Sequence, residues 1–201
     1  MSDHLCEIDV SDIDLADERY KILFSENNIE FLAQSIEETG LIYPPIVRPV
    51  NNKFIIISGF NRIRAHIHNN SVHNGKIKIV VYKTNADTTD YQCLLKSIAA
   101  LAFKRPLTQA ELIACTSRLY HFLDEKQIAE KSSAIFNTEL SVRFVKDLLI
   151  AAGLPDPGLK LIHTGHLSFK SAKKIALFEK DTIKIFLEIF SNIRASNNKQ
   201  L

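Results

Sequence analysis

The sequence lacks the closely spaced cysteines that would indicate a zinc site or a disulfide framework. Its three cysteines, Cys6, Cys93 and Cys115, are scattered, and none forms a CxxC motif or a cysteine–histidine pair at ligand spacing. Structural zinc sites and small disulfide-stabilised domains both depend on such spacings. We therefore predict three free thiols and no metal site built on them.

The sequence also has no hydrophobic run near the roughly 20 residues that are needed to cross a bilayer. It opens with the acidic stretch MSDHLCEIDVSDIDLADE, whereas a secretory signal has basic residues followed by an apolar segment. Its 201 residues are 46% hydrophobic and 24% charged, which is an ordinary globular balance. These features predict a cytoplasmic protein with no membrane partner.

No strong excess of one charge is present in the whole chain, which carries 25 Lys and Arg against 23 Asp and Glu. The two halves differ, however. Residues 1–103 carry 10 basic against 13 acidic side chains, a balance of −3, and residues 104–201 carry 15 against 10, a balance of +5. Because positive charge attracts a polyanion, we predict that the second half contacts nucleic acid.

Hydrophobic periodicity predicts an α+β fold, with a small mixed α/β domain followed by an all-helical domain. In the first half, Ser25 and Gly40 are expected to cap one helix, and Asn51-Asn52 to form the tight turn of a hairpin. The predicted strands lie near residues 6–15, 45–50, 53–58 and 76–83, and the predicted helices at 26–39, 61–69 and 88–103. We expect 6–15 to be an edge strand with a charged outer face.

Pro106 ends the helix at 88–103 and opens the helical half. Further helices are predicted at 108–123, 124–137, 141–152, 156–163, 168–178 and 181–194. The predicted domains are therefore 1–87 and 107–201, joined by a connecting helix within 88–106. The helix at 181–194 is apolar on one face, through Ile183, Phe186, Leu187 and Phe190, and either packs internally or forms a dimer.

The sharpest local pattern is the apolar strand Phe54 to Ile57, which stops at a glycine and continues as a basic helix. Glycine lets the backbone approach a ligand, and the first N–H groups of a helix have no partner and attract anions. The candidate phosphate-binding residues are Ser58, Gly59, Asn61, Arg62 and Arg64. The alternative is structural: the glycine serves the turn alone, and the arginines lie at the surface or in ion pairs.

A second pattern predicts a helix-turn-helix motif, whose recognition helix is expected at 141–152. Ser141 and Arg143 lie near its N-terminus, where base and phosphate contacts form, and Lys146 lies on the same face as Arg143 at i, i+3. The preceding stretch SSAIFNTEL is longer than the usual connection of three or four residues. A second basic cluster consists of Lys170, Lys173 and Lys174. These lysines either bind phosphates or are simply the solvated face of a helix.

Two long segments resemble the ParB partition proteins. NNIEFLAQSIEETGLIYPPIVRPVNNKFIIISGFNRIRAHI resembles the nucleotide-binding domain of that family, which has a ParB/sulfiredoxin-like fold. LTQAELIACTSRLYHFLDEKQIAEK and SVRFVKDLLIAAGLPDPGLKLIHTGHLSFKSAKKIALF resemble its helical DNA-binding domain. Together they cover roughly residues 5–178. The resemblance implies a bacterial protein of chromosome or plasmid partition that binds CTP and DNA and closes as a homodimer.

The chain departs from the family pattern where catalysis would occur. The family has Gly-Glu-Arg-Arg-x-Arg-Ala at the turn, and here Phe60 and Asn61 replace the first Glu and Arg. Ala100 and Leu101 stand where a Glu-Asn pair would help to hold magnesium. A phenyl ring and aliphatic groups can neither orient water nor bind a metal ion. We therefore expect CTP or another anion to bind without hydrolysis, and we do not expect magnesium.

The leading hypothesis is a ParB-like DNA-binding protein of the partition or transcription-regulator type. The basic N-terminal arm through which many family members engage a partner ATPase has no counterpart in this sequence, so we do not expect that partner. One alternative is an enzyme of the same fold, which would be a nucleotide hydrolase, a kinase or a nuclease. A further alternative is a protein-interaction module that does not bind DNA.

Overall fold

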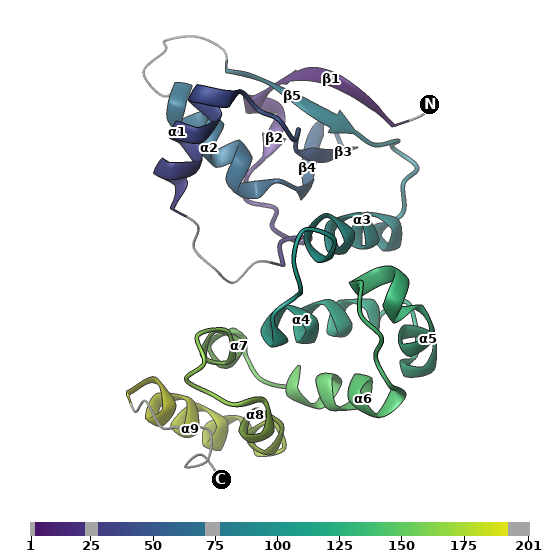
Figure 1. Ribbon diagram of the computed structural model, residues 1–201, viewed down its shortest axis with the longest axis vertical. Helices are drawn as coiled ribbons and strands as arrows, with labels where there is room; N and C mark the ends of the chain where they lie inside the picture. Colours follow the sequence, from purple (N-terminus) through teal and green to yellow (C-terminus); the bar gives the residue numbers. More distant parts are fainter. Residues whose placement is uncertain (1–2, 23–27, 71–76, 193–201) are drawn as a thin grey trace. The chain divides into compact units, whose positions relative to one another are not determined.

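The computed structural model describes residues 3–22, 28–70 and 77–192 (Figure 1). The chain divides into two units, and the main division falls inside one helix, between Ser97 and Ile98. Unit 1 comprises residues 1–21 and 26–97, and unit 2 comprises residues 22–25 and 98–201. The connecting segment predicted at 88–106 contains this division.

Within the described residues, unit 1 contains one mixed sheet of five strands. The strands are β1 (His4–Asp9), β2 (Ile13–Asp14), β3 (Ile46–Val50), β4 (Lys53–Ser58) and β5 (Lys78–Lys83), in the order β1-β5-β3-β4-β2. β3 and β4 form an antiparallel hairpin. Its turn residues Asn51 and Asn52 both have positive φ, as the tight-turn prediction requires.

The prediction of one edge strand over 6–15 was wrong, because this segment forms two strands at opposite edges of the sheet. A short 3₁₀ helix (Val10–Asp12) separates β1 from β2, and the Asp9 side chain caps it by accepting a hydrogen bond from the Ser11 N–H. β1 pairs antiparallel with β5, and β2 pairs parallel with β4. The alternating pattern in the sequence did not show this interruption.

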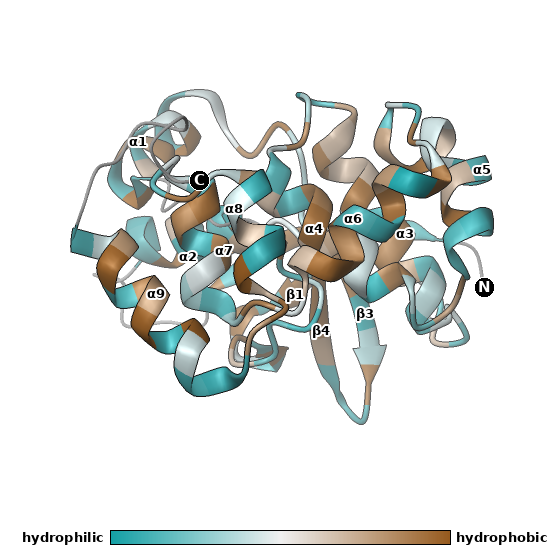
Figure 2. Cartoon of the chain, turned by 90° about the horizontal axis from the view of Figure 1, so that it is seen from below, coloured by the Kyte–Doolittle hydropathy of each residue, from teal (hydrophilic) through white to brown (hydrophobic). Residues whose placement is uncertain are grey.

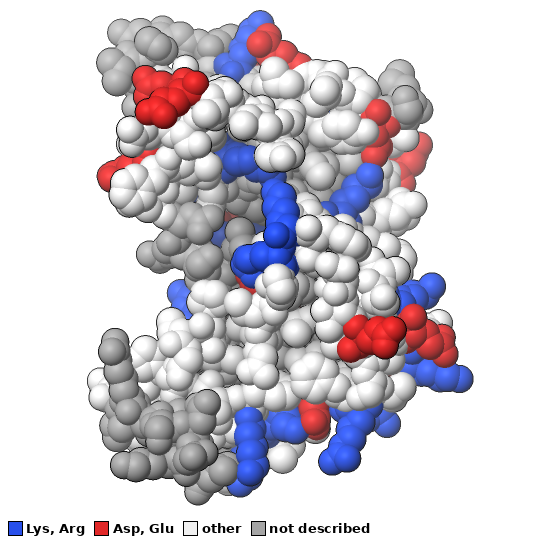
Figure 3. All heavy atoms as spheres, in the orientation of Figure 1, with Lys and Arg blue, Asp and Glu red and all other residues white. Residues whose placement is uncertain are grey.

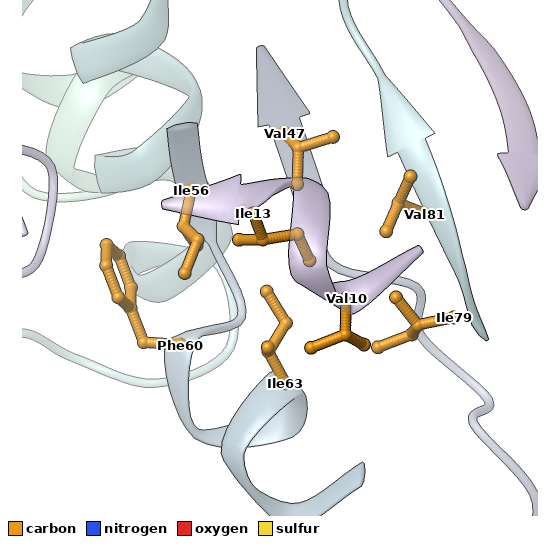
Figure 4. Packing of buried hydrophobic residues seen from close by; sticks show 8 residues of the cluster. All are labelled: Val10, Ile13, Val47, Ile56, Phe60, Ile63, Ile79 and Val81. Carbon is orange, nitrogen blue, oxygen red and sulfur yellow. The ribbon is translucent and has the colours of Figure 1, made fainter. Parts of the chain in front are cut away.

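This connection requires the sheet to curl. The two edge strands of a flat five-stranded sheet would lie about 19 Å apart, at about 4.8 Å per spacing. The chain from Asp9 to Ile13 can span only about 14 Å even when fully extended. The edges must therefore approach each other across the face that Val10 and Ile13 cover. Figure 4 shows both side chains among residues of β3, β4, β5 and the helix that follows β4.

That helix is α2 (Phe60–Asn70), and it packs beside α1 (Ile29–Thr39). The amide of Asn69 donates to the carbonyl of Ala33 at 2.6 Å, which links the two helices. Asn28 caps α1, with its side-chain oxygen accepting from the N–H groups of Glu30 and Phe31, so the helix begins three residues after the predicted start. The predicted cap, Ser25, lies outside the described residues. Gly40 ends the helix with a φ of 74°, as predicted.

The last helix of unit 1, α3 (Asp90–Ala102), continues into unit 2. A polar cluster fixes its first turn. Asp90 accepts hydrogen bonds from the Tyr20 hydroxyl at 2.7 Å and from the Arg48 guanidinium at 2.5 Å. These donors hold the pKa of Asp90 below its usual range, and burial together with the bond to Asp90 raises the pKa of Tyr20. The cluster therefore joins α3 to β3 and to the segment that follows β2.

Unit 2 is helical throughout its described residues. It continues from α3 through α4 (Gln109–Leu119), α5 (Glu125–Phe136), α6 (Val142–Ala151), α7 (Asp156–His163), α8 (Phe169–Ile175) and α9 (Lys180–Asn192). α4 packs against α5, α6 and α7; α6 also packs against α5 and α8, and α7 against α8 and α9. Figure 2 shows hydrophobic and hydrophilic residues alternating along α9. Its Ile183 and Leu187 are buried, whereas Phe186 and Phe190 are only partly buried, so the apolar face of this helix packs internally only in part.

An ion pair between a half-exposed arginine and a buried glutamate fixes the start of α4. Thr108 and Glu111 form a reciprocal capping box, and the Arg105 guanidinium donates to both oxygens of Glu111 at 2.7 and 2.8 Å. The Glu111 side chain is fully buried. Burial alone would raise the pKa of this carboxyl, but the bonds from Arg105 and Thr108 outweigh it and hold the pKa below its ordinary value.

Candidate functional site

The turn from β4 to α2 is the candidate phosphate site, and its geometry requires glycine. Gly59 has a φ of 98°, which is strained for any other residue. A Cβ atom at this position would lie 2.9 Å from the Cβ and 3.0 Å from the Cα of Pro45. The loop before β3 therefore packs directly on the turn, so part of the space above the glycine is filled by protein.

Arg62 stabilises this loop through its guanidinium. The Nη1 group donates to the backbone carbonyl of Tyr43 and, at 3.3 Å, to that of Pro44. Burial lowers the pKa of Arg62 from its usual value, although a guanidinium stays charged in proteins. An incoming phosphate would have to compete with these two carbonyls for the cation.

The other candidate residues at the turn are less enclosed. Arg64 is exposed and forms an ion pair with Glu18 at 2.7 Å. Ser58, at the end of β4, and Asn61, in the first turn of α2, are both partly buried. The fold thus brings all five predicted residues into one strand–turn–helix segment, and protein groups already engage both arginines. Anion binding here stays a prediction.

Phe60 occupies a different environment from the turn residues on either side of it. Its ring is buried in the core of unit 1 and lies near Ile13, Ile56 and Ile63 (Figure 4). The side chain that replaces the family's glutamate therefore contributes to packing. No group of three or more His, Cys, Asp or Glu residues suited to a metal ion is found in the described part of the chain.

The second candidate site is the helix pair α5 and α6. Helix α5 extends to Phe136, so most of the stretch SSAIFNTEL is helical and only five residues, 137–141, connect the pair. Asn137 ends α5 in the left-handed conformation, at φ 54°. The Ser132 hydroxyl accepts from the Leu140 N–H at 2.8 Å and donates to the Ala129 carbonyl at 2.7 Å. The connection is therefore shorter than expected, and a buried serine anchors it.

Helix α6 exposes the residues that the helix-turn-helix prediction requires. Ser141 is its N-cap, and its hydroxyl accepts from the Phe144 N–H at 3.2 Å. Arg143 and Lys146 are exposed. Val145 and Leu148 are fully buried and hold the opposite face of the helix in the core. Two cations near the start of one helix suit phosphate or base contacts.

The lysine cluster on α8 divides into two kinds of residue. Lys170 and Lys174 are exposed, whereas Lys173 forms an ion pair with Asp147 of α6 at 2.6 Å. Lys173 also lies over the ring of Phe169, which contacts the ring of Phe144 edge to face at 5.7 Å. Lys173 therefore joins α8 to α6, which leaves less of its charge available to a ligand.

The surface over these helices is mixed in charge. In Figure 3, basic side chains gather at the lower end of the view, over α6 and α8, with acidic atoms between them. The charge balance of the sequence did not show that Asp147, next to Lys146 on α6, reduces the positive charge of this surface. The pattern also did not identify Ser132, since a serine in an amphipathic helix has no distinctive signal.

The fold defines a class of protein in which a mixed α/β domain precedes a helical domain. Residues 1–98 match the family model of the ParB N-terminal domain. The described helices include none that is long and apolar enough to cross a membrane. The chain is ParB-like, because its first half is similar to the ParB N-terminal domain.

Three relatives extend this comparison. A probable chromosome-partitioning protein ParB from Chlamydia muridarum is 24% identical over 193 residues, which cover 92% of this chain and 64% of that protein. The chain thus spans less than two thirds of this relative's length. The structure of the pNOB8-like ParB N-domain aligns over 99% of this chain and 94% of its own, at 12% identity and a TM-score of 0.54, which shows the common fold.

The third relative is the C-terminally truncated ParB from Caulobacter crescentus, which has been solved in two complexes. The complex with CTP-gamma-S aligns at 20% identity and a TM-score of 0.42 over 94% of this chain and 99% of that one. The complex with the centromeric parS site aligns at 18% identity and a TM-score of 0.48 over 97% and 96%.

Proposed function

We propose that this chain is a ParB-like DNA-binding protein of the partition or transcription-regulator type. The observation that carries the proposal is the pair α5 and α6, which a short anchored connection joins and whose second helix exposes Arg143 and Lys146. Lys170 and Lys174 on the adjacent α8 extend the basic surface. Arg143 and Lys146 contact phosphates or base edges, while Lys173 positions α8.

The N-terminal domain, in this proposal, binds CTP or another anion at the Gly59 turn without hydrolysing it. The free N–H groups expected at the start of α2 and the cation of Arg64 are the remaining donors. Phe60 lies in the core and supplies no oxygen or nitrogen to activate water. A bound phosphate would draw Arg62 away from the carbonyls of Tyr43 and Pro44. The loop that contains these two residues would therefore respond to nucleotide binding.

Fluorescence anisotropy with a labelled 30-base-pair duplex of mixed sequence, measured across a series of salt concentrations, tests DNA binding. We expect the double variant Arg143→Ala, Lys146→Ala to bind more weakly and to reduce the slope of log affinity against log salt by about 1.8, at about 0.9 for each lost phosphate contact. The matched control is Lys180→Ala, Lys184→Ala, which removes the same charge from α9. Equal loss in both double variants, or no binding by the unchanged protein, would contradict the proposal.

Calorimetric titration with CTP, ATP and GTP, with and without magnesium, tests the turn. We expect CTP to bind without a metal requirement, Arg64→Ala to weaken the binding, and no phosphate release to accompany it. Absence of heat with every nucleotide would refute the nucleotide proposal and leave the DNA proposal standing.

A further inference from the structure

Unit 2 contains an apolar groove between α7 and α9 that the proposed DNA surface does not use. Its volume is about 660 Å³. Leu154, Leu161, Ile183 and Leu187 supply apolar lining. α7 and α9 approach closely because Gly158 has no side chain: a Cβ there would lie 3.3 Å from Cδ2 of Leu187. The groove is thus formed by the packing of two helices.

Charged side chains stand on both walls of this groove. Lys160 comes from α7, and Lys180 and Lys184 come from α9, one turn apart. All three are exposed, and the single acidic lining residue, Glu188, lies one turn beyond Lys184. The apolar interior is therefore bordered on two sides by positive charge.

We propose that this groove binds an amphipathic helix of a partner protein, with an apolar stripe flanked by acidic residues. A helix in a groove is anchored by apolar side chains at i, i+3, i+4 and i+7. Cations on both walls match acidic residues on both sides of such a stripe, whereas a fatty acid carries only one anionic head. Glu188 gives the groove a direction, because the acidic part of the helix lies beside Lys180 and Lys184.

The last nine residues of this chain do not match the groove in charge. The segment IRASNNKQL has two basic residues and no acidic residue, so its charge has the same sign as the lysines of the groove. An acidic partner is the occupant that complements both the apolar interior and the lysines.

Selection from a displayed library of 16-residue helical peptides tests this proposal. Each peptide keeps Leu at i, i+3, i+4 and i+7 and varies Glu, Gln and Lys at the flanking positions. We expect the full-length protein to enrich Glu flanks. By fluorescence anisotropy, the selected peptide should bind at least about tenfold more weakly to Lys160→Glu, Lys184→Glu, and selection against that variant should enrich Lys flanks.

The control variant is Lys126→Glu, Lys131→Glu on α5, which carries the same change in charge outside the groove and should bind the selected peptide as before. Circular dichroism of both double variants confirms that they are folded. Three results would overturn the proposal: no enrichment, equal loss in the control, or peptide binding that appears only when residues 193–201 are deleted. A concentration-dependent dimer that the groove variant abolishes would identify a second copy as the occupant, and would overturn it as well.

Discussion

The β4–α2 turn of unit 1 and the α5–α6 pair of unit 2 both place basic residues near the start of a helix, but they use them differently. At the turn, Arg62 donates to the carbonyls of a neighbouring loop and Arg64 pairs with Glu18. On α6, Arg143 and Lys146 are exposed and have no ion pair among the residues that the structure describes. A basic residue beside a helix terminus is available to a ligand only when no protein acceptor reaches it first.

This difference has a physical origin. Arg62 is enclosed by a loop that packs within van der Waals distance of Gly59, and a guanidinium removed from water must be hydrogen-bonded. Arg143 lies on the solvent side of a helix whose other face is buried, so water can solvate it. Arg62 therefore mainly stabilises the fold, whereas Arg143 stays available to bind an anion.

The largest effect is expected from Gly59→Ala, which tests whether the turn is a packed structural element. Positive φ and a clash with Pro45 together should lower the free energy of unfolding by about 4 kcal/mol. The matched control is Gly40→Ala, where φ is 74° but the surrounding space is open, and about 1 kcal/mol is expected. Urea denaturation followed by circular dichroism measures both. Equal losses would show that Pro45 does not restrict the turn.

Arg105→Ala extends the comparison to a half-exposed cation of unit 2 whose partner, Glu111, is fully buried. Leaving Glu111 buried without its partner should cost about 3 kcal/mol. The same pair predicts a dependence on pH. The folded-state pKa of Glu111 lies below the 4.5 of an ordinary glutamate, so its stabilisation is complete above pH 4.5 and is lost as the pH falls through the folded value.

Chemical denaturation between pH 3 and pH 7 measures this dependence. Glu111→Gln keeps much of the cap geometry and removes the titrating group, so its stability should fall less steeply in acid. If the stability of Glu111→Gln falls in acid as steeply as that of the unchanged protein, the Arg105–Glu111 pair is not the source of the pH dependence.

Arg62→Ala and Arg64→Ala compare the two arginines of the turn directly. Loss of the bonds to Tyr43 and Pro44 should destabilise unit 1 by about 2 kcal/mol. Loss of the exposed pair with Glu18 should cost about 0.5 kcal/mol, since exposed ion pairs contribute little. Thermal unfolding of the two variants separates these values. A larger loss of stability in Arg64→Ala than in Arg62→Ala would show that Arg64, and not Arg62, is the arginine that stabilises the turn.

The smallest effect is expected from Asp147→Asn, which makes the DNA surface of unit 2 more positive. Removing one acidic group between the basic residues of α6 and α8 should raise affinity for duplex DNA about twofold at low salt. Fluorescence anisotropy measures the change, with Glu188→Gln on α9 as the control for net charge. Equal gains in both variants would show that Asp147 has no local effect on DNA.

Much of the fold could be predicted from the sequence. The Gly40 end of α1, the Asn51-Asn52 hairpin turn and the glycine after β4 each depend on neighbours within a few residues, and the structure has all three. The split of residues 6–15 into two edge strands could not be predicted, because it depends on the distant β5 and β4 with which the strands pair.

The candidate sites also combine features that the local sequence determines with features that only tertiary contacts determine. The sequence determined which segments carry glycine, arginine and lysine at helix starts, because local spacing and helix geometry fix those positions. Only the tertiary structure decided that Tyr43 and Pro44 engage Arg62, that Asp147 engages Lys173, and that Phe60 enters the core. Tyr43 and Pro44 lie 19 and 18 positions from Arg62, and Asp147 lies 26 positions from Lys173. Folding alone brings partners so far apart in the sequence close enough to interact.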